Sequence, residues 1–191
     1  KKQIKLHSIN KITGFHTRNV PHKAHEFLFR ESLKKTDGLL LQPMTIQYKK
    51  NEYTEQTLKN SYKKLKRIYK NPKIIFSTFF SYPRYSGPRE AALHSIVRKN
   101  YGCTHFIIGR DHAGFKNFYK LYESQKFCKK LSNKMGITIL DIKEPYFCKK
   151  CMIILNKCNC NKKKYKISIS GSKIRKMILS NKKIPKIFMR K

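Results

Sequence analysis

The chain has 191 residues, a length that predicts one domain with a sizeable core, and its 45 Lys and Arg against 10 Asp and Glu give a formal net charge of +35. Hydrophobic residues make up 39% of the chain and aromatic residues 12%, which argues against a disordered protein despite the charge. No apolar run approaches the roughly 18 residues of a membrane span, and the N-terminus lacks the apolar region of a signal peptide, so a membrane protein is excluded and secretion has no support.

Predicted strands and helices alternate along most of the chain. Apolar runs predict strands at Lys11–His16, Gly38–Ile46, Lys73–Phe80, Thr104–Gly109 and Ile137–Ile142. Helices are predicted between them at Pro21–Lys35, Thr54–Tyr69, Pro88–Tyr101 and Lys116–Met135. Proline early in the first helix loses no helical hydrogen bond, and Gly102 and Gly136 follow the last two helices as stop signals. Strands joined by helices predict parallel βαβ units, and therefore a three-layer α/β domain.

The last fifty residues have a different character. Phe147–Tyr165 carries four cysteines and a run of lysines, and Ser168–Ser180 predicts a polar turn that leads into a short amphipathic helix. We therefore expect an α/β domain at residues 1–145, a loop at 146–165 and a small helical C-terminal subdomain at 166–191.

Polar clusters follow three of the predicted strands, at His16–Asn19, Ser81–Arg89 and Gly109–Gly114. Parallel sheets bind ligands beyond the carboxyl ends of their strands. We therefore expect these clusters, which lie far apart in the sequence, to converge on one cleft.

The first cluster belongs to the segment GFHTRNVPHKAHE at Gly14–Glu26. His22 and His25 lie three residues apart on the first turn of a predicted helix, so both can face the cleft. A helix N-terminus with free N–H groups is a site for phosphate oxygens. Paired histidines are often surface or metal-binding residues, so the pair alone is weak evidence. A zinc-protease site is excluded, because HKAH lacks the spacing and the glutamate of H-E-x-x-H.

The other two clusters are bounded by glycines. IIGRDHAG at Ile107–Gly114 directly follows an apolar strand, and backbone N–H groups beside its second glycine could bind an anion. An ordinary turn with Arg110 and Asp111 as an exposed pair explains this segment equally well. The segment YSGPREAALHSIVRKNYGCTHF at Tyr85–Phe106 opens a helix at its Gly-Pro pair.

These motifs together resemble the catalytic domain of the ATP sulfurylase (sulfate adenylyltransferase) family. That family carries Q-T-R-N-P-x-H-x-x-H, G-P-R-E-A with R-K-N-Y-G-C-T-H-F, G-R-D-H-A-G and a late I-S-G-T-x-(I/L/F)-R. This chain has HTRNVPHKAH, GPREAALHSIVRKNYGCTHFIIGRDHAG and ISGSKIR in the same order. It departs from the pattern at His16, where the family more often has Gln, and at Val20, where the family has Pro.

The resemblance implies a Rossmann-like nucleotidyltransferase domain that catalyses the reaction of ATP and sulfate to adenylylsulfate and pyrophosphate. A sulfate oxygen would attack the α-phosphorus in line, with no covalent enzyme intermediate, so catalysis would consist of positioning and charge stabilisation. Mg²⁺ would arrive with ATP rather than sit in a protein cage. The resemblance further implies a cytoplasmic enzyme that forms homo-oligomers.

The resemblance also implies roles for individual residues. Arg18 would bind sulfate and contact ATP, and Thr17 and Asn19 would orient the α-phosphate. Sulfate would also lie near the Ala113 N–H and near His16, whose charge would depend on pH. The β- and γ-phosphates would be held by His22 and His25, and the nucleotide site would be lined by His16, Gly109, Arg110, Asp111 and His112. A mobile loop of the family corresponds to Pro83–Pro88.

Four cysteines form C-x₂-C-x₆-C-x-C at Cys148, Cys151, Cys158 and Cys160. The first pair has the spacing of structural zinc sites, whereas the second pair is tighter than usual. Bacterial ATP sulfurylases often carry a zinc loop here, commonly with three Cys and one His, and this chain has no His after Cys148. Reduced, unligated thiols are the alternative, and disulfides are not expected in the cytosol. Cys103 and Cys128 are predicted to be packing residues.

The family usually places a PUA-like domain before the catalytic domain. This chain begins about a dozen residues before its first motif, so we expect that domain to be absent, in a chain that is either a fragment or a naturally reduced enzyme. The sequence has no G-x-x-x-x-G-K-[ST] motif, so a fused adenylylsulfate kinase is not expected.

Other classes of function remain open. Another nucleotidyltransferase of the same superfamily is disfavoured by GRDHAG and RKNYGCTHF, and an inactive homologue is disfavoured by the intact charged motifs. A basic nucleic-acid-binding protein with a zinc loop would explain the net charge. However, the chain has 36 Lys against 9 Arg, whereas base readout favours arginine. A compositional bias towards lysine at exposed positions explains the charge better, and we do not expect a nucleic-acid partner.

Overall fold

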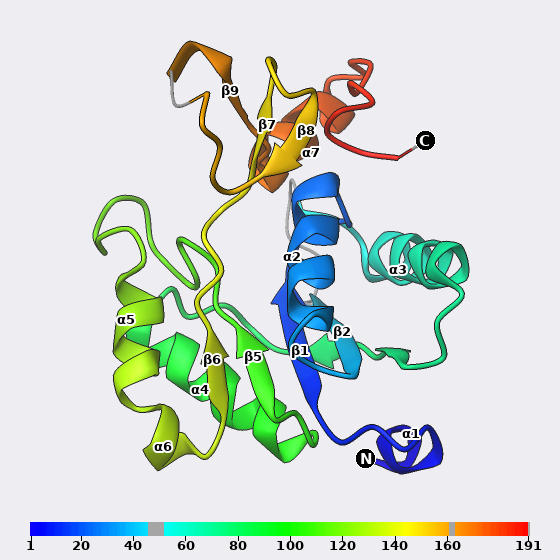
Figure 1. Ribbon diagram of the computed structural model, residues 1–191, viewed down its shortest axis with the longest axis vertical. Coiled ribbons are helices and arrows are strands. Elements are labelled where there is room, and N and C mark those ends of the chain that lie inside the picture. The colour runs from blue at the N-terminus through cyan, green and yellow to red at the C-terminus, as the bar shows by residue number, and fades with distance from the viewer. Residues whose placement is uncertain (46–51, 161–162, 191) are drawn as a thin grey trace.

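The computed structural model describes residues 1–45, 52–160 and 163–190 (Figure 1). Its centre is a parallel sheet with the strand order β3-β2-β1-β5-β6, and β4 pairs with β2 further along that strand. The strands are β1 (Ile12–Thr17), β2 (Gly38–Thr45), β3 (Ile74–Phe76), β4 (Phe79–Phe80), β5 (His105–Ile107) and β6 (Thr138–Leu140). The predicted α/β fold with a parallel sheet is confirmed.

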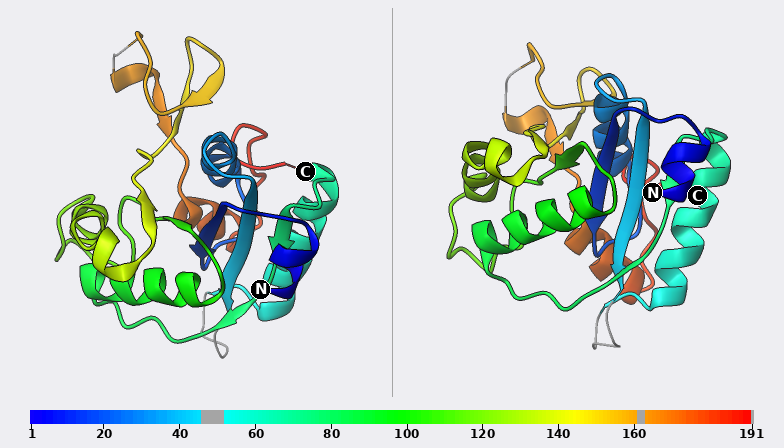
Figure 2. Two further views of the ribbon diagram at one scale, coloured as in Figure 1. Left: turned by 60° about the horizontal axis from the view of Figure 1, so that its bottom comes forward. Right: turned by 90° about the horizontal axis from the view of Figure 1, so that it is seen from below.

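Helices lie on both sides of this sheet, with α4, α5 and α6 grouped on one side and α3 on the other (Figure 2). The helices are α1 (Lys2–Leu6), α2 (Lys23–Leu33), α3 (Glu55–Tyr69), α4 (Gly87–Asn100), α5 (Glu123–Lys130), α6 (Ser132–Met135) and α7 (Gly171–Leu179). Within the described ranges, no helix combines the length and the apolar character that a membrane crossing requires.

The period of two along each strand divides the core into two clusters. Leu40 of β2 and Phe106 of β5 pack in a cluster with residues of α4, α5 and α6. Their neighbours Leu39, Leu41 and Ile107 pack in a second cluster with residues of α2 and α3. A strand buried on both faces reads as a continuous apolar run, which is why GLLLQPMT was recognisable as a strand.

A second, antiparallel sheet with the order β8-β7-β9 lies near the carboxyl ends of the parallel strands, next to α7 (Figure 1). It consists of β7 (Tyr146–Cys148), β8 (Ile153–Leu155) and β9 (Lys166–Ser168), the last preceded by a 3₁₀ turn at Lys163–Tyr165. A third apolar cluster of Ala24, Phe147, Ile169, Ile174 and Phe188 joins α2, this sheet, α7 and the C-terminal segment. Three-residue strands among cysteines and lysines carry no periodic signal, so the sequence did not predict this sheet.

Most predicted elements are confirmed to within a few residues, and the predicted helix at Ser168–Ser180 corresponds to α7. The strand predicted at Lys73–Phe80 is two strands, β3 and β4, because regular pairing with β2 is interrupted after Phe76. The Ser77 N–H still donates to the Leu41 carbonyl at 3.1 Å, and pairing with β2 resumes at Phe79. The helix predicted at Lys116–Met135 begins only at Glu123. Lys116 and Tyr122 have left-handed backbones, with φ of 49° and 63°, which end any helix through them.

Two further predictions concern segment ends. The helix predicted at Pro21–Lys35 begins at Lys23, so Pro21 lies outside it and His22 is the N-cap residue. The predicted last residue of the second strand, Ile46, lies outside the described residues.

Candidate functional site

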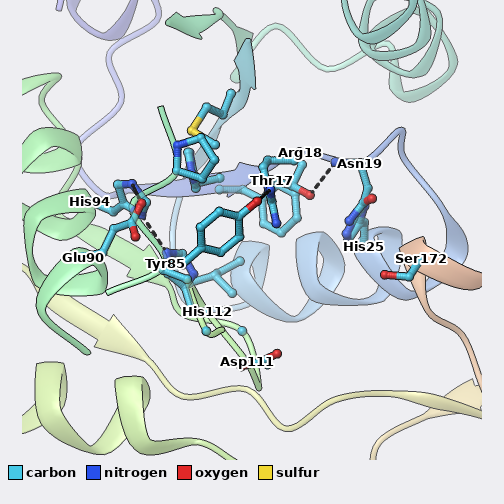
Figure 3. A pocket seen from close by; sticks show the side chains of 18 of the residues that line it. Thr17, Arg18, Asn19, His25, Tyr85, Glu90, His94, Asp111, His112 and Ser172 are labelled. Atoms are coloured by element: carbon cyan, nitrogen blue, oxygen red, sulfur yellow. Dashed lines mark hydrogen bonds and ion pairs between the residues drawn. The ribbon is translucent and has the colours of Figure 1, made fainter. Parts of the chain in front are cut away.

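The three polar clusters meet in one cleft of about 330 Å³ beyond the carboxyl ends of the parallel strands (Figure 3). The predicted convergence is therefore confirmed, and α7 contributes as a fourth element. The polar residues that line the cleft are His16, Thr17, Arg18, Asn19, His25, Tyr85, Glu90, His94, Asp111, His112, Ser172 and Arg175. The backbone at Gly109, Ala113 and Gly114 completes the lining.

Arg18 is placed at the cleft by a tyrosine and a glutamate. Its Nη1 donates to the Tyr85 hydroxyl at 2.9 Å and lies 3.7 Å from the Glu52 carboxylate. The same carboxylate pairs closely with Arg175 of α7, whose guanidinium lies over the Tyr53 ring. Glu52 thus lies between two arginines, a position in which a bound anion would find the same partners.

Thr17 and Asn19, on either side of Arg18, are held in place by hydrogen bonds that involve the Asn19 backbone. The Thr17 hydroxyl accepts from the Asn19 N–H at 3.1 Å, and the Asn19 carbonyl accepts from the Tyr62 hydroxyl at 3.1 Å. The Asn19 amide lies against Gly171 at the start of α7, where an added Cβ would come within 2.4 Å of the amide carbon. Only glycine allows α7 to approach this closely, so the ISGSKIR segment requires its glycine for packing at the cleft.

His22 and His25 stack with ring centroids 3.6 Å apart, but they are placed differently. His22 is the N-cap of α2 and its Nδ1 accepts the His25 backbone N–H at 3.3 Å, so its Nε2 carries the hydrogen. His25 faces the cleft, whereas His22 is not among the lining residues. Burial lowers the pKa of His22 to about 4 and holds that of His25 well below its ordinary value. Both rings are therefore neutral at pH 7 and offer hydrogen bonds rather than positive charge.

A polar chain in the wall of the cleft runs from α4 to the loop after β5. His94 Nδ1 lies 3.0 Å from His112 Nε2, and His94 Nε2 lies 3.7 Å from the Glu90 carboxylate. Glu90 accepts the backbone N–H groups of Arg84 at 3.0 Å and Ser86 at 3.1 Å. These bonds hold the loop that presents Tyr85, which has a left-handed φ of 56°. Burial, followed by the charge of Arg98, lowers the pKa of His94 to about 3.

The GRDHAG segment forms a tight loop at the edge of the cleft. Ala113 has φ of 58°, and its carbonyl accepts the Gly87 N–H at 2.9 Å, which ties this loop to the start of α4. Arg110 is not among the lining residues, and its Nη1 pairs with Glu144 Oε2 at 2.9 Å. The expected position of Arg110 at the nucleotide site is therefore not seen in this structure.

Several residues of the site were not identified from the sequence. Tyr85, Glu90 and His94 lie inside the recognised middle motif but carried no assigned role, and Arg98 from the same motif is fully buried next to His16. Glu52 lies in a polar stretch with no recognised pattern. Glu90, His94 and Arg98 are polar residues on the buried face of a helix, and that position was the available signal that they belong to the site.

The four cysteines form a compact cluster at the small sheet. Their sulfurs all lie within 4.8 Å of one another, with Cys151 Sγ at 3.3 Å from both Cys158 Sγ and Cys160 Sγ. Four sulfurs at about 2.3 Å from a tetrahedral zinc are about 3.8 Å apart, so this arrangement fits the metal. The Cys151 backbone N–H donates to Cys148 Sγ at 3.5 Å. Cys103 and Cys128 are buried in the core, as predicted.

The chain as a whole is similar to proteins of one family. A family model described as ATP-sulfurylase matches residues 1–191. A sulfate adenylyltransferase of Ignicoccus hospitalis is 41% identical over 182 residues, which are 94% of this chain and 47% of that relative. One of Hyperthermus butylicus is 40% identical over 181 residues, which are 94% of this chain and 46% of the relative. The chain thus spans about half the length of the curated relatives that it matches.

Among solved structures, a hexameric APS kinase from Thiobacillus denitrificans has a similar fold. The TM-score is 0.75 at 16% identity, over 98% of this chain and 36% of that chain. At this identity the likeness concerns the fold alone.

Proposed function

This chain belongs to the ATP-sulfurylase family, and from that premise we propose that it transfers the adenylyl group of ATP to sulfate. The observation that carries the proposal is the convergence of the HTRN, GRDHAG and ISGSKIR segments on one cleft. A sulfate oxygen attacks the α-phosphorus, the bond from that phosphorus to the bridging oxygen breaks, and pyrophosphate leaves with the electron pair. Sulfate is already an oxyanion, so no nucleophilic side chain is needed.

The arginines supply the charge that brings two anions together. Arg18, oriented by Tyr85, is proposed to bind sulfate and contact the α-phosphate, with Thr17 and Asn19 beside it. Positioned donors at a site of developing charge stabilise the transition state without reorganisation. Ala113, on the loop tied to α4, is proposed to offer its N–H to sulfate, and His16 is proposed to offer a hydrogen bond.

The histidines are proposed to hold the departing pyrophosphate by hydrogen bonds. His25 faces the cleft. His22 has its hydrogen on Nε2 but does not line the cleft in this structure, so it would have to move to donate to a phosphate oxygen. Gly109, Asp111 and His112 are proposed to line the nucleotide site, and Arg110 would join them only after leaving Glu144. Mg²⁺ would come with ATP, as the family resemblance implies.

The cysteine cluster is proposed to bind one structural zinc. Four thiolates close a tetrahedral shell and leave no position for catalysis. The cluster is carried by the loop at 146–165, which leads through β9 to α7 in the subdomain at 166–191, and α7 contributes Ser172 and Arg175 to the cleft. Zinc would therefore act on activity through the placement of α7. Homo-oligomerisation and a cytoplasmic location remain predictions from the family resemblance.

The direct test is ATP–pyrophosphate exchange with and without sulfate. Exchange should require sulfate, and Arg18→Ala should lower it by about 10²–10³-fold, the usual loss for a positioned charge at a developing anion. Arg67→Ala, an exposed arginine on α3 away from the cleft, is the matched control and should retain the exchange rate. Exchange without sulfate, or more than about a tenth of the activity left in Arg18→Ala, would contradict the proposal.

A further inference from the structure

Arg98 is a buried guanidinium whose one hydrogen-bond partner in the described parts of the chain is a histidine. The side chain is 0% exposed, and its Nη2 lies in close contact with His16 Nδ1. Its Nε and Nη1 have no hydrogen-bond partner among the described residues. The rings of Phe79 and Phe106 lie 4.6 Å and 5.7 Å from its central carbon and hold it by cation–π contact.

The backbone of β1 is shaped for this contact. Gly14 and His16 are two residues apart on one strand, so they share a face of the sheet. A Cβ at Gly14 would come within 2.8 Å of Arg98 Cγ. Glycine at this position therefore lets the arginine pass beneath the strand and reach the imidazole. A buried charge without a carboxylate is destabilising, which indicates that Arg98 serves a purpose other than stability.

The chemistry of the two groups decides where the imidazole hydrogen lies. A guanidinium has donors only, so His16 Nδ1 accepts and its hydrogen is on Nε2. Protonation of Nδ1 would place two N–H groups against each other and add a second positive charge. Among the described residues, the charged and titratable groups that act on His16 are Arg98 and His94 from α4, His112 from the loop after β5, and the neighbouring Arg18.

None of those four groups can carry a negative charge that would favour an imidazolium. Burial, followed by the charge of Arg98, holds the pKa of His16 well below its ordinary value, so the expectation from the sequence that its charge would depend on pH is wrong near neutral pH. Burial also lowers the pKa of Arg98 to about 10, so the guanidinium keeps its charge at neutral pH.

We propose that Arg98 is a positioning residue that fixes His16 as the neutral Nε2–H tautomer, so that His16 gives the cleft a hydrogen-bond donor whose state is independent of pH. The oxyanion that receives this hydrogen bond is sulfate, and for this identity the inference rests on the proposed function. A glutamine side chain could make the same two hydrogen bonds, because its amide oxygen accepts, as His16 Nδ1 does from Arg98, and its amide nitrogen donates, as His16 Nε2–H does towards the cleft. The structure thereby explains how histidine can occupy a position where the family more often has glutamine.

The first experiment needs no variant and no substrate. Two-bond ¹H–¹⁵N correlation spectra of the histidine-labelled protein, with His16 assigned through His16→Gln, report which ring nitrogen carries the hydrogen. We expect the hydrogen on Nε2 and no titration of His16 between pH 6 and pH 8. A hydrogen on Nδ1, or titration in that range, would overturn the proposal. This readout stays informative if sulfate is not the substrate, so the failures of the two proposals are distinguishable.

The second experiment asks whether Arg98 acts through His16. Arg98→Met should raise the KM for sulfate by about tenfold, as expected for one misplaced hydrogen bond to a charged group, and change the KM for ATP less than about twofold. In the His16→Ala background the same substitution should have less than about a twofold effect on the KM for sulfate, because coupled residues are not additive. Arg89→Met, exposed on the same helix, is the control. Equal effects in both backgrounds would show a merely structural role. If Arg98→Met does not fold, the spectra of the unaltered protein decide.

Discussion

Acidification should destabilise this protein through histidines that are buried in neutral form. Burial lowers the pKa of His22 to about 4 and that of His94 to about 3, whereas a histidine in the unfolded chain has a pKa of about 6.5. As the pH falls below about 6.5, the unfolded state takes up protons that the folded state does not. The stability from each histidine is therefore complete above that pH and is lost progressively towards pH 4 for His22 and pH 3 for His94.

The magnitude follows from the same pKa values. At pH 5 an unfolded histidine has gained about 2 kcal/mol from proton binding, while the folded state has gained almost nothing. His22 and His94 together should therefore lower the free energy of unfolding by about 4 kcal/mol between pH 7 and pH 5. Both side chains are nearly inaccessible, at 4% and 3% exposure, so solvent screening does not reduce this figure greatly.

Urea unfolding at pH 7 and pH 5 measures this loss. His22→Asn keeps an oxygen acceptor at the N-cap of α2 but cannot titrate, so its loss of stability between the two pH values should be about 2 kcal/mol smaller than that of the unaltered protein. His105→Asn, at a half-buried position outside the cleft, is the control and should recover less. If His22→Asn and the unaltered protein lose equal stability on acidification, the reasoning about buried neutral histidines is wrong.

Three further predictions concern the zinc cluster and the cleft. Elemental analysis should find about one zinc per chain. Cys151→Ser or strong chelation should lower the melting temperature before it lowers activity at a permissive temperature, because a closed thiolate site contributes folding free energy. A metal-free protein with an unchanged melting temperature would contradict this prediction. Tyr85→Phe should raise the KM for sulfate about fivefold, since Arg18 loses a hydrogen bond of about 1 kcal/mol, while Tyr82→Phe on the same loop should behave as the unaltered protein. Gly171→Ala should destabilise the protein by about 1–3 kcal/mol in urea unfolding, because its Cβ would meet the Asn19 amide, and an unchanged unfolding midpoint would show that α7 can move away.

The sequence located the cleft because its chemistry is local to strand ends. His16–Asn19 and Gly109–Gly114 directly follow apolar strands, and the carboxyl ends of parallel strands share one edge of a sheet. The position of His25 at the cleft followed from helix spacing. His22 was placed wrongly on the first turn, because its own imidazole forms the cap and a propensity for capping by histidine is weak.

Irregular segments escaped prediction for a related reason. The chain between Lys116 and Tyr122 has residues compatible with a helix, but the Tyr122 N–H donates to the Arg110 carbonyl at 2.8 Å and the backbone is held in another conformation. Likewise, Arg110 pairs with Glu144 across the fold, a partner that no spacing in GRDHAG indicates. In both cases a contact with a distant part of the chain overrides the local preference.

The sequence by itself determined the alternation of strands and helices, the family and the polar side chains of the cleft that directly follow strands β1 and β5, because periodicity, turn residues and motif order are properties of neighbouring residues. Only the tertiary structure decided the states of those side chains. Arg98 contacts His16, which is 82 residues away in the sequence. Glu52 lies between Arg18 and Arg175, which belong to two other segments of the chain. Whether an imidazole is neutral, or a guanidinium is paired, depends on burial and on the nearest charge, and both are set by how distant segments pack.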